Sequence, residues 1–496
     1  MRPALGSRWL LCGITALTVV ALPNALYGKE RKIKSDTDLS SLGATSGTFS
    51  DSIKFDKNGN TLFIDGDVND VTLAGEIHVK SGRNGNTIEA ESDFTGTVSL
   101  SADNDFEGDT EVDSVLNVGS ATALSAQSKL KVNNGGTVKL NGFDSTVAGL
   151  EGNGTIQGSA ALTAGDENDA TFSGILQDGT GALAFTKQGS GTQTLSGANT
   201  YSGATTLNAG TLVLGNASAA GTGTISQTDG TSLLRLNTTG TVTNAMSLYN
   251  VESLQDVTLS GNITAFNTTY DIATGTTTTL SGDISGSGGV TKEGLGTLVL
   301  EGTNTYTGTT DINAGTLLIN ASNAGATSAY EINSGGTLGG TGSIGGATTL
   351  DSGGFLSPGD GGTGDTLSFL SSLDIQNASA GSLLFDLGAA GTGDTVNVTG
   401  QLSIGDGLLD LDSFAFTDLG VTSVTGTYTW NLFNVGSYDF TTLGSNTTST
   451  PFASIKSASL AISGDFIQLT MTVPEPSSTA LLGLGGIALM LRRKRS

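Results

Sequence analysis

The sequence has very little of the chemistry that disulfides and metal sites need. Cys12 and His78 are the single cysteine and the single histidine among 496 residues. Cys12 lies in the apolar leader described below, so the mature chain has no cysteine for a disulfide or a thiolate metal site. One histidine cannot build a multi-histidine zinc site, and His78 stands in the alternating run EIHVK, which is typical of a strand. We therefore expect no metal and no cofactor.

Basic residues are scarce too, and proline is rare. The chain carries 21 lysines and arginines against 46 acidic residues, which gives a formal net charge of −25. Between Asn141 and Leu491 the basic residues are Lys187, Arg235, Lys292 and Lys456. Such a surface repels phosphate backbones, so we expect no nucleic-acid partner. With 74 glycines, 6 prolines and 36% apolar residues, the composition is typical of all-β proteins with many tight turns rather than of disordered chains.

Enzymatic motifs are missing as well. The sequence contains neither G-x-S-x-G nor a phosphate-binding loop. Paired carboxylates could serve glycoside chemistry, but such sites usually also need Lys or Arg to stabilise developing charge, and few follow Lys139. We predict no catalytic residues and no enzyme.

Some acidic and threonine-rich stretches allow a second interpretation. Residues 103–108 read DNDFEG and begin like a calcium loop, but Ser114 stands where an EF-hand needs its final glutamate. We interpret these residues, and the acidic turns at Asp65 and Gly165, as solvated turns, with calcium binding as the open alternative. Residues 276–279 are all threonine, and flat ranks of threonine can bind ice. β-Propensity and ladders between neighbouring turns are the simpler interpretation.

The N-terminus has the pattern of a secretory signal peptide. Arg2 and Arg8 precede an apolar run from Trp9 to Leu22, and a small residue stands just before the charged KERKIK. We predict that residues 1–28 are removed by cleavage between Gly28 and Lys29.

The C-terminus reads VPEPSSTALLGLGGIALMLRRKRS. Residues 479–491 are apolar and would form a helix of about 20 Å, short of the ~30 Å hydrocarbon core. The basic residues after it favour a cytoplasmic end, so we expect a transient anchor in the inner membrane. By resemblance of this tail to the PEP-CTERM sorting signal, the predicted sorting residues are Val473, Pro474, Glu475, Pro476, Arg492, Arg493, Lys494 and Arg495.

This tail resembles the PEP-CTERM sorting signal, also known as the ice-binding protein C-terminal domain, in all three parts and their order. The resemblance implies recognition by an exosortase-type processing enzyme and delivery to the cell surface or the extracellular polysaccharide matrix. It covers the last 24 residues and names a destination rather than an activity.

A long repeat dominates the middle of the chain. Residues 186–212 and 291–317 share 17 of 27 positions, with the skeleton TK-x-G-x-GT-x-x-L-x-G-x-NTY-x-G-x-T-x-x-NAGTL. A weaker third copy covers about 96–119, where Phe106 replaces the tyrosine. The signature residues of the two strong copies are Asn199, Thr200, Tyr201, Gly203, Asn304, Thr305, Tyr306 and Gly308.

Short β runs bounded by glycine and asparagine fill these copies, and no stretch has the periodicity of an amphipathic helix. Parallel strands without crossover helices predict a solenoid, in which each unit buries its apolar face against its neighbours. Threonine and asparagine would form ladders between turns. We expect Tyr201 and Tyr306 at a corner, covering an edge of the core.

The skeleton also resembles the autotransporter-associated β-strand repeat, most clearly at 189–214 and 294–319. The resemblance implies a right-handed parallel β-helix that serves as a stalk and has no chemistry of its own. The predicted fold class is therefore all-β, a right-handed parallel β-solenoid with a C-terminal β-rich module and a short C-terminal transmembrane helix.

These observations predict five segments. They are a signal peptide (1–28), an N-terminal β cap (29–90), a β-solenoid (91–380) with repeats at about 96–119, 186–215 and 291–320, a C-terminal β-rich module (381–472) and a PEP-CTERM tail (473–496). We predict a secreted, non-enzymatic structural or adhesive solenoid of the bacterial surface or exopolysaccharide matrix, with exopolysaccharide or a second copy as its contact. The alternative is a β-helix protein that binds or cleaves polysaccharide.

Overall fold

The computed structural model describes residues 97–405, 408–421, 425–444, 452 and 455–474, and the backbone of eight strands before them. The chain divides into two compact units, Met1–Thr163 with Asp178–Gly181, and Ala164–Gln177 with Ala182–Ser496. We call them the N-terminal unit and the C-terminal unit. Among the described residues, no helix is long and apolar enough to cross a membrane. The predicted anchor helix and signal peptide lie outside the described residues.

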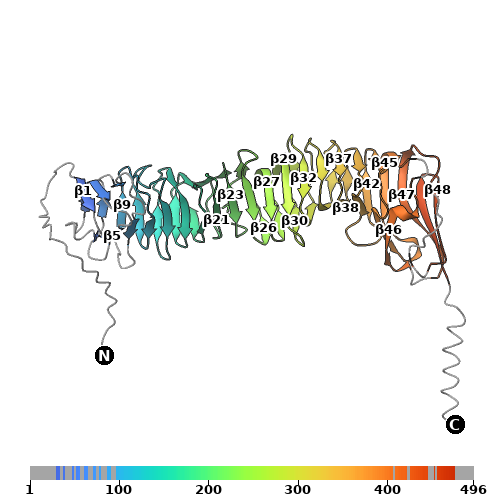
Figure 1. The fold of residues 1–496 in the computed structure, drawn as a ribbon, viewed down its shortest axis with the longest axis horizontal. Coiled ribbons are helices and arrows are strands. Elements are labelled where there is room, and N and C mark those ends of the chain that lie inside the picture. Colours follow the sequence, from blue (N-terminus) through green and yellow to red (C-terminus); the bar gives the residue numbers. More distant parts are fainter. Residues whose placement is uncertain are drawn as a thin grey trace, which may run out of the picture. The chain divides into compact units, whose positions relative to one another are not determined.

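The N-terminal unit consists of short parallel strands on successive turns of the chain (Figure 1). One sheet pairs β1 (Glu30–Ile33), β4 (Ser52–Phe55) and β7 (Ile77–Val79), and His78 lies in β7. A second series runs through β2 (Thr37–Asp38), β5 (Thr61–Ile64), β8 (Thr87–Ala90), β10 (Thr110–Val112), β12 (Lys129–Val132) and β15 (Gly149–Gly152). A third runs through β3 (Gly47–Phe49), β6 (Val71–Leu73), β9 (Thr97–Leu100), β11 (Val115–Val118), β13 (Thr137–Lys139) and β16 (Thr155–Gly158). The remaining strands near the sequence boundary of the units are β14 (Ser145–Val147), β17 (Ala161–Ala164) and β19 (Ile175–Asp178).

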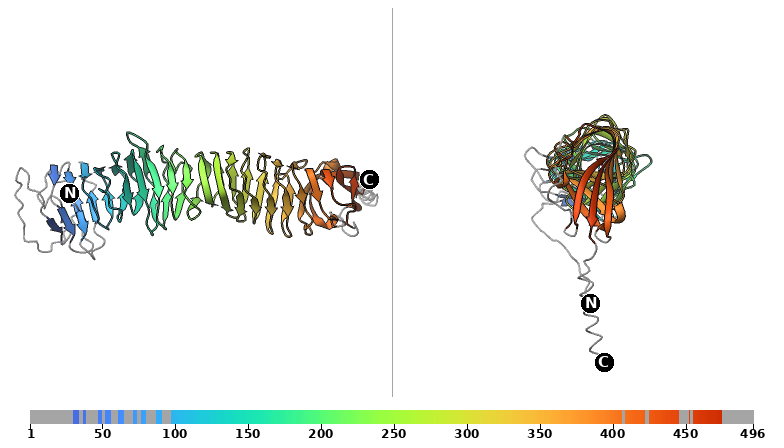
Figure 2. Two further views of the ribbon diagram at one scale, coloured as in Figure 1. Left: turned by 90° about the horizontal axis from the view of Figure 1, so that it is seen from above. Right: turned by 90° about the vertical axis from the view of Figure 1, so that its right-hand side faces the viewer.

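The C-terminal unit has three faces, each a series of parallel strands from successive turns (Figures 1 and 2). Face A comprises β20 (Ala184–Lys187), β22 (Thr205–Leu207), β24 (Ile225–Gln227), the first halves of β27 (Met246–Ser253) and β29 (Ile263–Ile272), β31 (Ile284–Ser285), β36 (Ser322–Asn323), β39 (Ser343–Ile344), β42 (Thr366–Phe369) and β45 (Thr395–Ser403). Face B comprises β18 (Ala170–Phe172), β21 (Thr192–Leu195), β23 (Thr211–Leu214), β25 (Leu233–Leu236), the second halves of β27 and β29, β32 (Val290–Glu293), β34 (Thr310–Ile312), β37 (Tyr330–Ile332), β40 (Thr348–Leu350) and β43 (Leu373–Asp374). Face C comprises β26 (Gly240–Val242), β28 (Val257–Leu259), β30 (Thr277–Leu280), β33 (Thr297–Leu300), β35 (Gly315–Ile319), β38 (Gly336–Gly340), β41 (Phe355–Pro358), β44 (Leu383–Gly388) and β46 (Phe414–Leu419).

One turn of this unit takes about 20 residues. On face C, Thr297 pairs with Thr316 and Thr316 with Thr337, separations of 19 and 21 residues. Alternate side chains point inward, so the same register stacks completely buried leucines on successive turns, Leu298, Leu317, Leu338 and Leu356. Each such leucine stabilises the fold by about 1.5–3 kcal/mol. The parallel β-solenoid predicted from the sequence is thus confirmed.

The ladder changes direction at the C-terminal end. β45 and β47 (Gly426–Tyr438) still pair in parallel, whereas β49 (Phe466–Val473) pairs antiparallel with both β47 and β48 (Ser457–Ser463), in orange and red in Figure 2. Two short 3-10 turns, η2 (Ala389–Gly391) and η3 (Leu411–Ser413), lie in this region. The antiparallel strands β49 and β48 thus extend the ladder beyond its last parallel pair.

Trp430 holds this end together. Its side chain is 1% exposed, and the indole Nε1 donates to the backbone oxygens of Gly388 at 3.2 Å and Thr392 at 2.9 Å. Beside it, the ring of Phe385 packs against Phe414 and Phe433, with centroids 5.7 and 5.6 Å apart. The aromatic residues of the C-terminal region therefore form a second, bulkier core after the aliphatic columns.

Replacing Trp430 by alanine should destabilise the C-terminal unit by about 3–5 kcal/mol, because the change leaves a large cavity and removes one hydrogen bond from each of two backbone oxygens. Guanidinium unfolding of the secreted chain, followed by far-UV circular dichroism, measures this. Leu419→Ala is the matched control, because Leu419 is 46% exposed on β46, and its effect should stay within about 0.5 kcal/mol. Equal midpoints for the two variants would show that the aromatic end does not support the unit.

Candidate functional site

The repeat signature is the place where the sequence concentrates its similarity, and its asparagine connects three successive turns. The Oδ1 atom of Asn199 accepts from the backbone N–H of Leu176 at 2.8 Å, and its Nδ2 donates to the Ala219 oxygen at 2.6 Å. Asn304 accepts in the same way from the Ile284 N–H at 2.8 Å and donates to the Asn323 side chain at 2.6 Å. Both asparagines are buried, so these bonds satisfy backbone groups where the regular ladder is interrupted.

The tyrosines of the signature lie between two strands, as the predicted corner position requires, but they are part of the core rather than a cover on its edge. Tyr201 and Tyr306 are both 0% exposed. The Tyr306 hydroxyl shares a hydrogen bond of 2.7 Å with Thr310, and Tyr201 has the equivalent bond to Thr205. A threonine four residues after each tyrosine gives the phenol its polar partner, which allows full burial of the ring.

The other signature residues are set by their neighbours in the stack. Thr200 and Thr305 point outward and are exposed. A side chain at Gly203 would place its Cβ 2.3 Å from the Leu183 oxygen, and one at Gly308 would place it 2.2 Å from the Gly289 nitrogen. These glycines let the backbone of one turn approach the next.

The asparagine of the weak third copy makes the equivalent donating contact inside the N-terminal unit. Asn104 donates through Nδ2 to the Ala123 oxygen at 2.6 Å, and Phe106 is 0% exposed in the place of the tyrosine. Thr110, which corresponds to Thr205, shares a hydrogen bond of 3.1 Å with Ser128 instead of a phenol. The core position therefore accepts a phenyl ring once the threonine has another partner.

The sequence reasoning missed the role of the lysine in the repeat. Lys187 and Lys292 are 1% and 0% exposed. The ammonium of Lys187 donates to the backbone oxygens of Gln188, Gly189 and Ala209 at 2.6, 2.8 and 3.2 Å. That of Lys292 donates to Glu293, Gly294 and Ala314 at 2.6, 2.8 and 3.1 Å. Each lysine thus ties its own corner to the NAG segment of the next turn.

The glycine of NAG is part of this arrangement. Gly210 and Gly315 have φ values of 65° and 63°, in the left-handed region. A Cβ atom on either glycine would also lie within 3 Å of the lysine ammonium, at 2.9 Å and 2.8 Å. The TK and NAG ends of the skeleton, 22 residues apart in each copy, are therefore one contact between adjacent turns.

Burial changes the acid–base chemistry of both lysines. Desolvation lowers the pKa of each ammonium from 10.5 to about 8, and nearby carboxylates oppose this shift, Asp166 and Asp169 for Lys187 and Asp271 and Glu293 for Lys292. The three carbonyl oxygens around each ammonium also favour its charged form. A signal was present in the sequence, because two of the four basic residues between 141 and 491 occupy the same repeat position.

The two strong copies do not face the same way. Their lysines are 105 residues apart, and Lys187 ends β20 on face A whereas Lys292 lies in β32 on face B. Along face A, the register leads from Lys187 through Leu207 and on through β24, β27 and β29 to β31, so the second copy begins five turns and one face later. The copies share internal contacts between turns, and they do not form a repeated surface.

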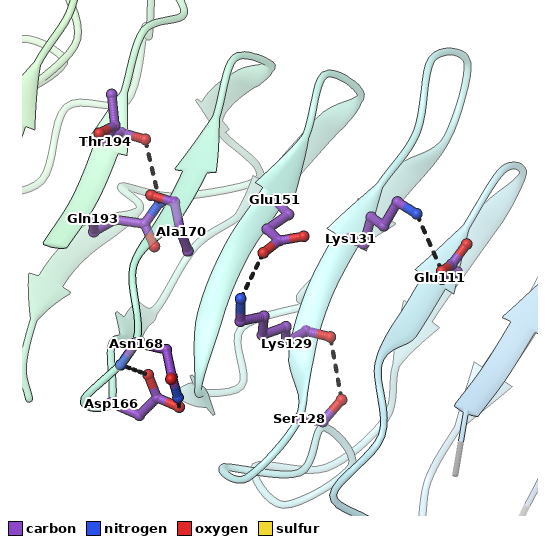
Figure 3. Close-up of polar contacts among 10 residues, drawn as sticks. All are labelled: Glu111, Ser128, Lys129, Lys131, Glu151, Asp166, Asn168, Ala170, Gln193 and Thr194. Atoms are coloured by element: carbon purple, nitrogen blue, oxygen red, sulfur yellow. Dashed lines mark hydrogen bonds and ion pairs between the residues drawn. The ribbon is translucent and has the colours of Figure 1, made fainter. Parts of the chain in front are cut away.

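Charged side chains of the N-terminal unit pair across turns on its outer surface. Lys131 contacts Glu111 at 3.1 Å, and Lys129 contacts Glu151 at 2.7 Å (Figure 3). At the predicted turn of residues 103–108, the Asp103 carboxylate accepts from the Thr122 hydroxyl of the next turn. In the part of the chain that the structure describes, no three His, Cys, Asp or Glu side chains gather as ligands for a metal ion.

The predicted sorting residues lie at the limit of the described chain. Val473 is the last residue of β49, and Pro474 follows it. The other sorting residues, and Gly28 and Lys29 of the predicted cleavage site, lie outside the described residues.

Replacing Lys292 by methionine should destabilise the C-terminal unit by about 2 kcal/mol. Three buried carbonyl oxygens lose their donor, and this loss exceeds what is regained by removing a desolvated charge. The midpoint of guanidinium unfolding measures the change. Lys456→Met, at an exposed position, is the control and should leave the midpoint unchanged. A Lys292→Met variant as stable as the control would contradict the structural role of the ammonium.

The lowered lysine pKa predicts that stability rises with pH above about 8. Between the folded pKa of about 8 and the ordinary 10.5, the unfolded chain binds more protons than the folded one. The free energy of unfolding therefore increases across this pH range, by about 1–2 kcal/mol per lysine. Above about pH 10, ionisation of tyrosines in the unfolded chain reverses this, because burial holds the pKa of Tyr201 and Tyr270 well above its usual range.

Unfolding midpoints measured from pH 7 to pH 11 test this prediction. We expect a maximum between about pH 9 and pH 10. The double variant Lys187→Met/Lys292→Met should lose the increase in stability above about pH 8 and keep the decrease above about pH 10. A rise that persists in the double variant would assign the effect to other groups.

Comparison with known proteins matches two parts of the chain. The passenger-associated-transport-repeat matches residues 185–214 and 290–319, and the PEP-CTERM protein-sorting motif matches residues 472–495. The adhesin BmaC autotransporter of Brucella suis biovar 1 (strain 1330) is 48% identical over 75 residues. The aligned stretch is 15% of this chain and spans 2% of the length of that adhesin. The chain therefore carries two copies of the passenger-associated-transport-repeat and a C-terminal PEP-CTERM sorting motif.

Proposed function

We propose that this protein is a secreted, non-enzymatic β-solenoid that is delivered to the bacterial surface or its extracellular matrix and acts there as an adhesive or structural component. The observation that carries the proposal is the junction between fold and sorting motif. The last strand, β49, ends at Val473, and the sorting motif begins at residue 472. The signal for sorting is thus attached directly to a folded solenoid, which becomes the delivered cargo.

The sorting motif implies processing by an exosortase-type enzyme. We propose that the segment after the motif anchors the chain briefly in the inner membrane and that the folded part is then released. A short apolar segment followed by Arg492, Arg493, Lys494 and Arg495 suits such a temporary anchor, because about 20 Å of helix does not span a ~30 Å core.

The internal contacts of the repeat support a stalk-like role rather than catalysis. Asparagine, tyrosine and lysine of the signature all point inward and satisfy other groups of the stack. The similarity to an adhesin lies in 75 residues and supports adhesion as the function of the outer surface. The acidic surface keeps such a chain soluble and repels nucleic acid.

Expression in a host with and without an exosortase tests the sorting half of the proposal. We expect a product outside the cell whose intact mass lacks the residues after about Pro476 only when the exosortase is present. Without the enzyme, the full-length chain should stay with the inner membrane. Val473→Ala/Pro474→Ala/Pro476→Ala should behave like the wild type in the host that lacks the enzyme.

A full-length product fixed in the inner membrane of both hosts would contradict the sorting proposal and the surface function with it. Retention of cells on a polysaccharide-coated surface tests the adhesive half. Cells that display the chain should be retained more than cells of a deletion strain, and equal retention would leave a structural role without adhesion.

A further inference from the structure

Two strands of the C-terminal unit that pair with each other, β27 and β29, continue from face A to face B. β27 and β29 pair along both faces, and their register shifts between Leu248 and Asn250. The corners of neighbouring turns read TDGTS at residues 228–232 and GSGG at residues 286–289. At the corresponding corner, where the register shifts, the two strands instead carry the aromatic residues Tyr249 and Phe266.

The two aromatic side chains form a pair at the surface. Their rings stack with centroids 5.2 Å apart and planes inclined by 15°. Phe266 is 38% exposed, and Tyr249 is half-buried. The preceding turn supports this corner from below, because the Gln227 side chain accepts from the backbone N–H groups of Tyr249 and Asn250 at 2.7 and 3.0 Å. A supported aromatic pair at the surface is a preorganised contact rather than a chance exposure.

A groove of about 350 Å³ begins next to this pair on face B. It crosses β25, β27 and β29, and its polar lining comes from Thr231, Asn250, Glu252, Thr269 and Asp271. Gly230 precedes the lining residue Thr231 and lies close to the Tyr249 ring. A Cβ atom on Gly230 would be 3.9 Å from the ring carbon Cδ1. The aromatic pair therefore lies beside the groove, whose lining begins at Asn250, the residue after Tyr249.

The charges of the groove restrict the ligand. Arg235, Glu252 and Asp271 form one rank across three turns, and the Arg235 Nε donates to the Glu252 carboxylate at 2.6 Å. The guanidinium is thus neutralised by its neighbour, and the nearby Lys292 ammonium is buried under backbone oxygens. The Arg235 side chain is 35% exposed but is paired with Glu252, and Asp271 adds a second carboxylate to the rank. An anionic polymer would therefore meet a net negative charge here and be repelled.

We infer that the aromatic pair and this groove form a binding site for an uncharged polysaccharide. A pyranose ring offers a C–H face that packs on an aromatic ring and hydroxyl groups that hydrogen-bond to carboxylates and amides. A concave site with an apolar contact and a few polar groups suits such a ligand. The inference rests on the proposed adhesive function and gives it a ligand class and a position.

Affinity electrophoresis of the secreted chain tests the site, in gels containing a soluble neutral β-glucan, a galactomannan, or alginate as the anionic polymer. At least one neutral polymer should retard the wild type, and alginate should not. Phe266→Ala should weaken the retardation about tenfold because the aromatic contact is lost. Phe266→Tyr keeps a ring and should restore it. Phe143→Ala is the matched control, because Phe143 is 37% exposed and lies in the N-terminal unit.

Circular dichroism of each variant confirms that it is folded, and Glu252→Gln/Asp271→Asn tests the polar half of the groove independently of the rings. Equal retardation of wild type and Phe266→Ala, absence of retardation by either neutral polymer, or equal binding of alginate would overturn the inference. Shortening of the polymer during incubation would reassign the groove to cleavage and overturn it too.

The retention assay on cells separates this inference from the proposed function. Cells that display Phe266→Ala and are retained as well as wild-type cells leave adhesion in place and contradict the site. Cells whose wild-type protein reaches the surface without increasing retention contradict the adhesive function, whatever the gels show.

Discussion

Each turn of the solenoid depends on its neighbours for its hydrogen bonds and for its core. A turn takes about 20 residues, and its short strands pair in parallel with the equivalent strands of neighbouring turns. Leucine columns such as Leu298, Leu317 and Leu338 bury apolar surface that one turn could not bury alone. The ladder satisfies the backbone along the faces but not at the corners, so the corners decide which polar side chains must lie inside.

Three kinds of side chain meet that requirement in the C-terminal unit. Asn199 connects backbone groups of the turns on both sides, Lys187 collects three carbonyl oxygens, and Gln227 accepts two N–H groups of the next turn while it donates to the Ser232 and Asn250 oxygens. A neutral amide achieves this without the desolvation of a charge. Burial lowers the pKa of the Lys187 ammonium. The fold tolerates this buried cation because its three N–H groups supply hydrogen-bond donors that several separate side chains would otherwise have to supply at this corner.

Much of this fold could be predicted from the sequence, because glycine-bounded β runs without helices leave few alternatives to a solenoid. The complete burial of Tyr201 could not be predicted, since it depends on Thr205, four residues later, which supplies the hydrogen-bond partner of the tyrosine hydroxyl. The buried lysines were missed because an isolated cation in an acidic chain suggests a solvated surface. Whether Lys187 points inward depends on where β20 ends. The corners vary in length by one or two residues, so the periodicity of the sequence does not show which residue ends the strand. The same variation places the second copy one face further round.

This offset between the copies limits where a function can be located. The asparagine, tyrosine, lysine and glycine residues that the copies share make contacts between turns inside the stack, so their similarity reports on stability. Surface chemistry must come from the segments in which the turns differ. β27 and β29 are such a segment, because they continue through a corner that glycine and serine occupy in neighbouring turns. Lengthening a strand through a corner brings Tyr249 and Phe266 to the surface and opens the groove beside them. A solenoid can in this way keep a common interior and acquire a binding surface across a few neighbouring turns.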